Sequence, residues 1–196
     1  MKNIGIIVGI IVIALLALML PSINNIPKYD EAAKASWSQV LNQYKRRADL
    51  VPNLVSTVKG YAAHEEKVLT EVTKARSAVS QMTISKDILS DQAAFAQFQS
   101  KQSELSSALS RLLVTVEKYP DLKANQNFVM LQSQLEGTEN RIAVARRDYI
   151  QAVQVYNTEL RTFPGRLWYK ILYSDMKLYE TFSVDAATQR TPEVKF

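Results

Sequence analysis

Residues 37–62 read WSQVLNQYKRRADLVPNLVSTVKGYA, and this stretch decides the fold class. Its apolar side chains recur at intervals of three and four residues, the period of an α-helix with one buried face. The same period extends in both directions, so one long helix is predicted from Lys28 to Val79. Pro52 removes a backbone hydrogen bond inside this helix and predicts a kink near residues 49–51, not an end.

A second helix with the same period is predicted from its apolar residues between Phe95 and Val116. It follows a break at residues 82–86, and either Asp87 or Asp91 can serve as its N-cap because a carboxylate accepts hydrogen bonds from the first free amides.

A third helix is predicted from about residue 123 to residue 161, between the turn at 119–121 and the Phe-Pro-Gly at 163–165. A short aromatic helical segment follows within residues 167–179. Sustained alternation with a period of two is absent from the sequence, and the turns are short. The prediction is therefore an all-α, antiparallel bundle of three long helices plus a short C-terminal helix.

The N-terminal segment Ile4–Leu20 reads IGIIVGIIVIALLALML and contains no charged or polar side chain. A helix of this length spans about 25 Å, the short end of a bilayer crossing. It lacks a clean signal-peptidase site, so an uncleaved transmembrane anchor is favoured over a signal peptide. The predicted organisation is an anchor at 1–23, a bundle body at 24–182 and an extended or mobile tail at 183–196.

The side of the membrane that holds the body stays undecided. Lys2 and the terminal amine precede the apolar run, and Lys28 and Lys34 follow it, so the positive-inside rule is balanced. Gly5 and Gly9 form a G-x-x-x-G pair on one helix face, which allows close approach of a second membrane helix, although Gly is also common in membrane helices generally.

Catalytic and metal-binding chemistry is poorly represented in this composition. The chain has no Cys and one His, His64, whose neighbours Glu65 and Glu66 stand at the wrong helical spacing to share a metal ion with it. His64 is predicted to lie on a helix surface. A non-enzymatic protein without cofactor or metal is predicted, and a hydrolase that uses His64 with a carboxylate is the less favoured class.

The densest polar cluster lies at residues 44–49 of the first helix and contains Tyr44, Arg46, Arg47 and Asp49. A second basic group on the third helix contains Arg141, Arg146 and Arg147 with Asp148. Forked guanidinium groups suit phosphate or lipid headgroups, but nearby carboxylates favour pairing between helices or between subunits. The net charge of +5 comes from interspersed basic and acidic residues, so nucleic-acid binding is not predicted.

The aromatic segment around Trp168 allows two interpretations. Its rings, together with Arg166, Lys170 and Lys177, fit a membrane-interface belt, because Trp and Tyr favour the headgroup zone and long basic side chains extend to it. The segment equally fits a cap over the end of the bundle core.

Several of these stretches together resemble the LemA family over nearly the whole chain. The matching stretches are ASWSQV (35–40), NQYKRRADLVPNLV (42–55), TVKGYAAHE (57–65), YPDLKAN (119–125), RRDY (146–149) and FP (163–164). The resemblance implies a bacterial inner-membrane protein with one N-terminal helix and a helical-bundle body, and it supplies no catalytic residues. The chain departs from the family pattern at Ile150 and at 166–170.

The sequence thus predicts a single-pass membrane scaffold that self-associates into a homo-oligomer and contacts membrane lipid. The alternative is an adaptor for another membrane protein, such as a protease or a signalling kinase, which would present the helix at 37–61 or the aromatic segment. The candidate interaction residues are Gly5, Gly9, Trp37, Tyr44, Arg46, Arg47, Asp49, Pro52, Arg146, Arg147 and Trp168.

Overall fold

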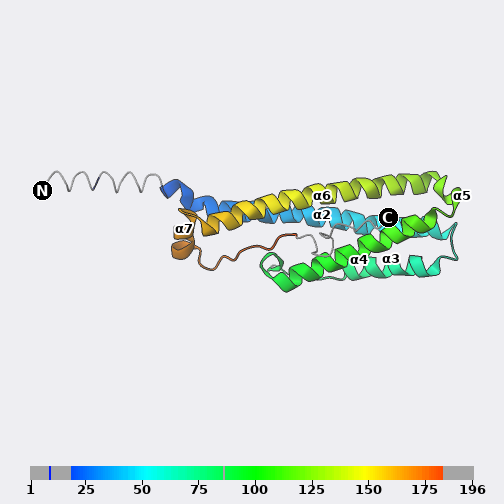
Figure 1. The fold of residues 1–196 in the computed structure, drawn as a ribbon, viewed down its shortest axis with the longest axis horizontal. Coiled ribbons are helices and arrows are strands. Elements are labelled where there is room, and N and C mark those ends of the chain that lie inside the picture. Colours follow the sequence, from blue (N-terminus) through cyan, green and yellow to red (C-terminus); the bar gives the residue numbers. More distant parts are fainter. Residues whose placement is uncertain (1–8, 10–18, 86, 183–196) are drawn as a thin grey trace, which may run out of the picture.

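The computed structural model describes residues 9, 19–85 and 87–182, and this part of the chain is helical and free of strands (Figure 1). Its long helices are α2 (Asn25–Lys59), α3 (Glu66–Ser80), α4 (Gln92–Val116) and α6 (Gln126–Arg161). Its short helices are η1 (Leu20–Asn24), η2 (Ile88–Ser90), α5 (Pro120–Lys123) and α7 (Gly165–Leu172).

The long helices form an elongated antiparallel bundle (Figure 1). Helix α2 runs from the N-terminal end of the bundle to the far end, α3 returns, α4 runs out again and α6 comes back. The closest pairs are α2 with α6 and α3 with α4. Both α7 and η1 therefore lie at the end where the chain enters the body, and α5 lies at the opposite end.

The prediction of three long helices is wrong, because the first predicted helix is two helices, α2 and α3, joined by a turn at residues 60–65. The apolar period does not show this break, because the turn itself buries an apolar residue. Val58, Ala62 and Leu69 all belong to one core cluster, so the spacing of buried residues continues while the chain reverses direction. The prediction at Pro52 is confirmed in that α2 passes through it without ending.

The remaining boundaries agree with the expected capping chemistry. Between the two candidate caps, it is Asp91 that begins α4, since its Oδ1 accepts hydrogen bonds from the amides of Ala93 and Ala94, each at 3.0 Å. Asp87 precedes η2 and makes no side-chain cap bond. The predicted third helix corresponds to α6, which begins at Gln126 and not near residue 123, because the Asn125 side chain caps it. The predicted short C-terminal helix corresponds to α7, which ends at Leu172, so the rest of the predicted segment to residue 179 is not helical.

Three clusters of buried side chains follow one another along the bundle. The cluster near α5 is mainly aliphatic and includes Val58, Leu109 and Leu135, with Phe128 as its buried aromatic member. The middle cluster is aromatic and centres on Trp37. The third cluster lies at the α7 end, where Ile26, Tyr156 and Leu160 pack against half-buried rings from residues 168–179. Helices α2 and α6 contribute to all three clusters, through the face that the apolar period of the sequence marks.

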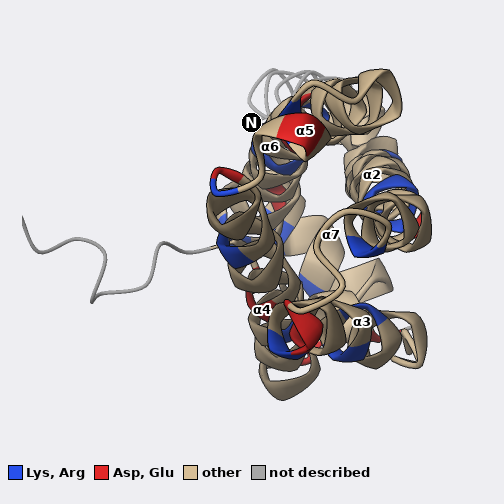
Figure 2. Ribbon diagram, turned by 90° about the vertical axis from the view of Figure 1, so that its right-hand side faces the viewer, with Lys and Arg blue, Asp and Glu red and all other residues tan. Residues whose placement is uncertain are grey.

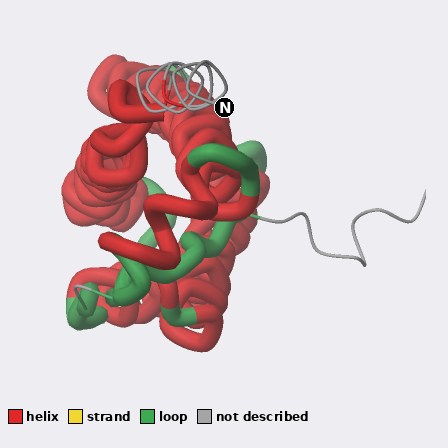
Figure 3. The backbone as a smooth tube through the Cα atoms, turned by 90° about the vertical axis from the view of Figure 1, so that its left-hand side faces the viewer, coloured by secondary structure: helices red, strands yellow, loops and turns green. Residues whose placement is uncertain are grey.

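After α7 the chain runs back along the bundle without helical structure, and we call residues 173–182 the strap (Figures 1 and 3). Side chains of α6 hold its backbone: the Tyr156 hydroxyl donates to the carbonyl of Lys177 at 3.0 Å. The Asn157 side chain donates to the carbonyl of Tyr179 and accepts from its amide, both at 2.9 Å. Phe182 then closes the strap by entering the aromatic cluster.

The predicted anchor and tail fall largely outside the described residues. Of the anchor segment only Gly9 and residues 19–23 are described, and the tail at 183–196 and Gly5 are not. Gly9 is helical, and a Cβ added to it would meet no atom within 4 Å. Among the described helices, none has both the length and the apolar character of a membrane-crossing segment.

Candidate functional site

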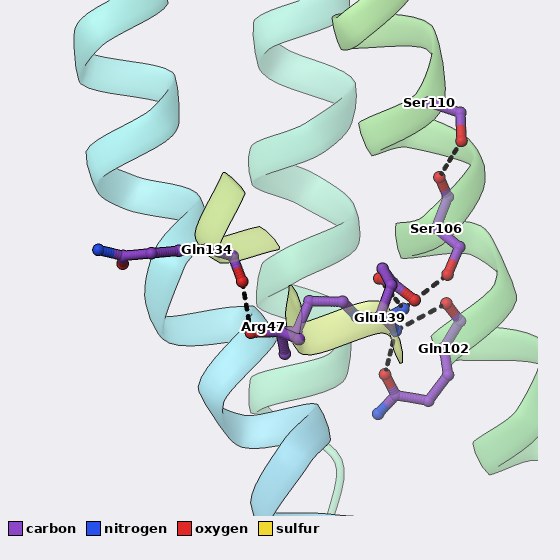
Figure 4. A network of polar contacts seen from close by, with 7 residues as sticks. Arg47, Gln102, Ser106, Ser110, Gln134 and Glu139 are labelled. Carbon is purple, nitrogen blue, oxygen red and sulfur yellow. Dashed lines mark hydrogen bonds and ion pairs between the residues drawn. The ribbon is translucent and has the colours of Figure 1, made fainter. Parts of the chain in front are cut away.

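Arg47 is the centre of a buried polar network that joins three helices (Figure 4). Its side chain projects from α2 and is 1% exposed. One terminal nitrogen donates to Ser106 Oγ at 2.6 Å and to Glu139 Oε1 at 2.9 Å. The other donates to the carbonyl oxygen and Oε1 of Gln102, at 3.1 and 2.7 Å. The guanidinium thus connects α2 with α4 and with α6.

The network reaches solvent at Glu139 and at half-buried Ser106, which lines the groove along α3 and α4. The Glu139 side chain is 42% exposed, while Gln102 is buried. The ring of Tyr44 lies one helical turn away, with its centroid 5.0 Å from the guanidinium carbon. Burial raises the pKa of this tyrosine, and the charges of Arg146 and Arg47 oppose that rise. Tyr44 therefore keeps its proton at neutral pH and acts as a packing surface for the cation.

The other charged residues of the two predicted groups, on α2 and α6, lie outside the hydrogen-bond network of Arg47 and do not gather into one site of their own. Arg46 and Asp49 are both exposed on α2, and in the described part of the chain no ion pair joins them. Arg147 pairs with its neighbour Asp148 on the surface at 3.2 Å. Arg146 lies over the ring of Phe182, 4.4 Å from its centroid. Within one chain, Arg47 pairs with a carboxylate between helices, and a pairing between subunits stays a prediction for Arg46 and Asp49.

Trp37 is buried in the aromatic cluster. The centroid of its ring system lies 5.0–6.1 Å from those of Phe95, Phe98, Tyr149 and Phe182. The inner face of α2 is therefore occupied by the chain's own core, whereas Pro52 is exposed on its outer side. A partner of α2 would meet the outer face with Pro52, not Trp37.

A second buried polar group, Asp30, lies where α2 meets the strap. Its carboxylate is 5% exposed and accepts from Lys34 Nζ at 2.6 Å and from the Tyr179 hydroxyl. Burial and the hydrogen bond to Asp30 raise the pKa of Tyr179. The pKa values of Tyr149 and Tyr156 are raised as well, mainly by burial.

These tyrosines make the fold sensitive to alkaline pH. In the unfolded chain they lose their protons near the ordinary value of 10, whereas the folded chain holds them. Stability is therefore full below pH 10 and is expected to fall above it, by at most about 1.4 kcal/mol per pH unit for each tyrosine. Ultraviolet titration should show tyrosines that ionise only as helicity is lost, fewer of them in Tyr179→Phe. Titration of every tyrosine near pH 10 with helicity intact would contradict this.

The aromatic segment caps the core at its end of the bundle. The rings of Trp168, Tyr169 and Tyr173 pack against the third cluster, and Trp168 Nε1 donates to Ser22 Oγ at 2.8 Å. Phe163 is the exception among these aromatic residues, since it is 75% exposed. Gly165 makes the corner compact, because a Cβ added to it would lie 2.2 Å from the carbonyl oxygen of Glu159.

The residue considered for catalysis, His64, is found outside the helices. His64 lies exposed in the turn between α2 and α3, and not on a helix surface as predicted, because the helix ends at Lys59. No group of three or more potential metal ligands gathers in the described ranges. A groove of about 920 Å³ follows α3 and α4 and is lined largely by Ala, Ser and charged side chains such as Glu71 and Lys101.

The sequence analysis missed several residues of these networks. Glu139, Gln102 and Ser106 are distant in sequence from Arg47, and no sequence pattern links them to it. The burial of Asp30 and Arg47 did have a signal. Asp30 stands four residues after buried Ile26, and Arg47 stands four residues before buried Val51, so both lie on the apolar face of α2.

Comparison with known proteins identifies relatives over most of the chain. The family model described as "LemA family" matches residues 36–196. "Magnetosome protein MamQ 2" of Paramagnetospirillum magneticum is 27% identical over 169 residues, which covers 78% of this chain and 62% of the relative. "Protein LemA" of Metamycoplasma hominis is 24% identical over 135 residues, which covers 69% and 56%. The chain thus spans little more than half the length of these relatives.

Proposed function

Since the chain belongs to the LemA family, we propose that it is a non-enzymatic scaffold anchored in the bacterial inner membrane by Ile4–Leu20 and assembled into a homo-oligomer. The apolar length of that segment supports the anchor. In the helical body that follows, both terminal nitrogens of the buried Arg47 are paired with groups on other helices, as a structural module requires.

The observation that carries self-association is a row of apolar side chains on the outside of α6. Met130, Val144 and Val155 are each about half exposed. The separations of 14 and 11 residues are close to whole numbers of helical turns, so these residues lie on one face. Gly137 stands midway between Met130 and Val144 on the same face, and the Arg141 guanidinium lies beside it, 3.4 Å from the place of a Cβ. Contact with α6 of a second copy would remove this row from water.

Other candidate residues are available for the same assembly. Gly5 and Gly9 would bring the membrane helices together, as a G-x-x-x-G pair does. Arg46 and Asp49 are exposed on α2 and free to pair with a neighbouring copy. Arg47 is not available for contacts between copies, because its buried side chain joins α2 to α4 and α6 within one chain.

The experiment is a mass measurement of the full chain in mild detergent at micromolar concentration. The wild-type chain is expected to give a discrete oligomer. Val144→Glu with Val155→Glu places charges in the row, and association is expected to weaken on the order of a hundredfold, for a cost of about 3 kcal/mol.

Val114→Glu is the matched control, because Val114 is an equally apolar residue that is 70% exposed on α4, away from the row. It should leave the oligomer unchanged. A wild-type chain that is only monomeric would contradict self-association, and equal effects of both variants would contradict the assignment to α6.

The alternative function is an adaptor for another membrane protein. The groove along α3 and α4 favours it, because alternating charges such as Glu71 and Lys101 suit a polar helix of a partner. Crosslinking in native membranes distinguishes the two. Adducts between copies support the scaffold, and a single recurrent adduct with one other membrane protein supports the adaptor.

A further inference from the structure

Helix α7 presents a face to the outside of the bundle that nothing in the described chain covers. Leu167 and Ile171 are one helical turn apart and exposed, and Ile171 is 62% exposed. Arg166 and Lys170 are likewise one turn apart and form an exposed row beside the apolar pair. A helix with an apolar row next to a basic row is the pattern of a helix that lies at a membrane surface.

The charged side chains of this helix are all basic. Residues 160–174 include Arg161, Arg166 and Lys170 and contain no acidic residue, and the flanking carboxylates are Glu159, whose side chain lies beside Gly165, and Asp175. Elsewhere on the bundle basic and acidic residues are interspersed, as the view from the opposite end shows (Figure 2). A partner of α7 is therefore expected to be negatively charged as well as apolar, which describes anionic lipid better than a second copy of this basic segment.

The place of α7 in the fold supports the same partner. The chain enters the body through η1, and the Trp168 ring nitrogen binds Ser22 in η1 at 2.8 Å. Leu20, the last residue of the proposed anchor, is exposed at this end, and so is Phe163. If the anchor crosses the bilayer, the link from Ser22 to Trp168 holds α7 within a few residues of the point where the chain leaves the membrane.

We propose that α7 docks on the membrane surface, with Leu167 and Ile171 in the acyl boundary and Arg166 and Lys170 on anionic headgroups. This inference rests on the proposed anchor. The basic and apolar residues at 166–172 would then fix the orientation of the bundle relative to the membrane surface. In this arrangement the inward aromatic rings of α7 pack against the bundle, and its outward aliphatic and basic side chains contact the lipid.

The test uses spin labels, because a chain without Cys allows a single thiol to be placed anywhere. Ile171→Cys and the control Val114→Cys, an exposed position at the far end of α4, carry a nitroxide in the full chain. The chains are reconstituted in phosphatidylcholine vesicles with and without phosphatidylglycerol. At position 171 collisions with lipid-dissolved oxygen are expected to exceed collisions with a water-soluble nickel chelate, and at position 114 the order should reverse.

Arg166→Gln combined with Lys170→Gln tests the headgroup contact. Each charge near an anionic surface is worth about fivefold in the docking equilibrium, from about 1 kcal/mol per Lys or Arg. The label at position 171 should therefore shift toward water in this variant, and also in vesicles without phosphatidylglycerol. A signal independent of both changes would overturn the headgroup contact.

Vesicle flotation separates this inference from the proposed anchor. A chain that does not float with vesicles overturns the anchor and the docking together. A chain that floats while both labels report water overturns the docking alone. Shielding of position 171 from oxygen and from nickel, relieved by dilution with unlabelled chain, would assign the face to a second copy and also overturn it.

Discussion

Arg47→Met is expected to lower the free energy of unfolding by about 3 kcal/mol. The substitution leaves buried Gln102 and half-buried Ser106 without the donor that now satisfies them. Glu139 is partly exposed and can return to water, which keeps the loss at the lower end of the range for a broken buried pair. Urea denaturation followed by circular dichroism measures the change.

Arg46→Met is the matched control, because the neighbouring arginine is exposed and makes no ion pair in the described structure. Its effect should stay within about 0.5 kcal/mol. Arg47→Lys should lose most of what Arg47→Met loses, since an ammonium group cannot reproduce the fork that reaches two helices. An Arg47→Met protein as stable as wild type would show that the network does not stabilise the fold.

Trp37→Ala is expected to cost about 4 kcal/mol, because it removes the largest side chain of the middle cluster and leaves a cavity there. Its ring system contacts residues from α4, α6 and the strap, namely Phe98, Tyr149 and Phe182. The strap should therefore loosen as well, and hydrogen exchange at the amides of Tyr179 and Glu180 is expected to accelerate.

Ser38→Ala controls for the loss at Trp37, since Ser38 is the next residue and its hydroxyl is exposed. It is expected to change stability by less than about 0.5 kcal/mol. Trp37→Phe keeps an aromatic ring in the cluster, so its loss of unfolding free energy should lie between those of Ser38→Ala and Trp37→Ala. A loss below about 1 kcal/mol for Trp37→Ala would mean that the cluster collapses around the gap, contrary to the expectation.

The helical class, the ends of α4, the C-terminal end of α6 and the presence of a short helix after it followed from the sequence, because each had a local signal. Asp91 could cap, Pro120 could not continue a helix, and the apolar period was unbroken within each element. The reversal between α2 and α3 did not follow, because Ala62 buries inside the turn and continues the period. Gly60 is a weak breaker, and its signal was outweighed by the apolar spacing on both sides.

For the polar networks, the sequence predicts which charged side chains are buried, but not which residues they bind. The register of α2 places Arg47 and Asp30 on the buried side, and a buried charge requires a partner. The partner itself depends on how the helices align, which is a tertiary property: Glu139 is 92 residues from Arg47, and Tyr179 is 149 residues from Asp30. Only the packing of the helices determines which carboxylate or hydroxyl of the chain lies within hydrogen-bond distance of Arg47 or Asp30.

The hydrogen bonds between the strap and the bundle are made mainly through the main chain of the strap, and this has a consequence for how freely its exposed positions can vary. The hydroxyls of Tyr149 and Tyr156 bind carbonyl oxygens, and Asn157 binds both main-chain groups of one residue. Such contacts are blind to the identity of the side chain. At the exposed positions Leu178 and Thr181, a cysteine that carries a fluorophore can therefore replace the native residue while the strap stays bound to the bundle. Tyr179 and Phe182 are unsuitable for such labels, because their side chains pack in the aromatic cluster.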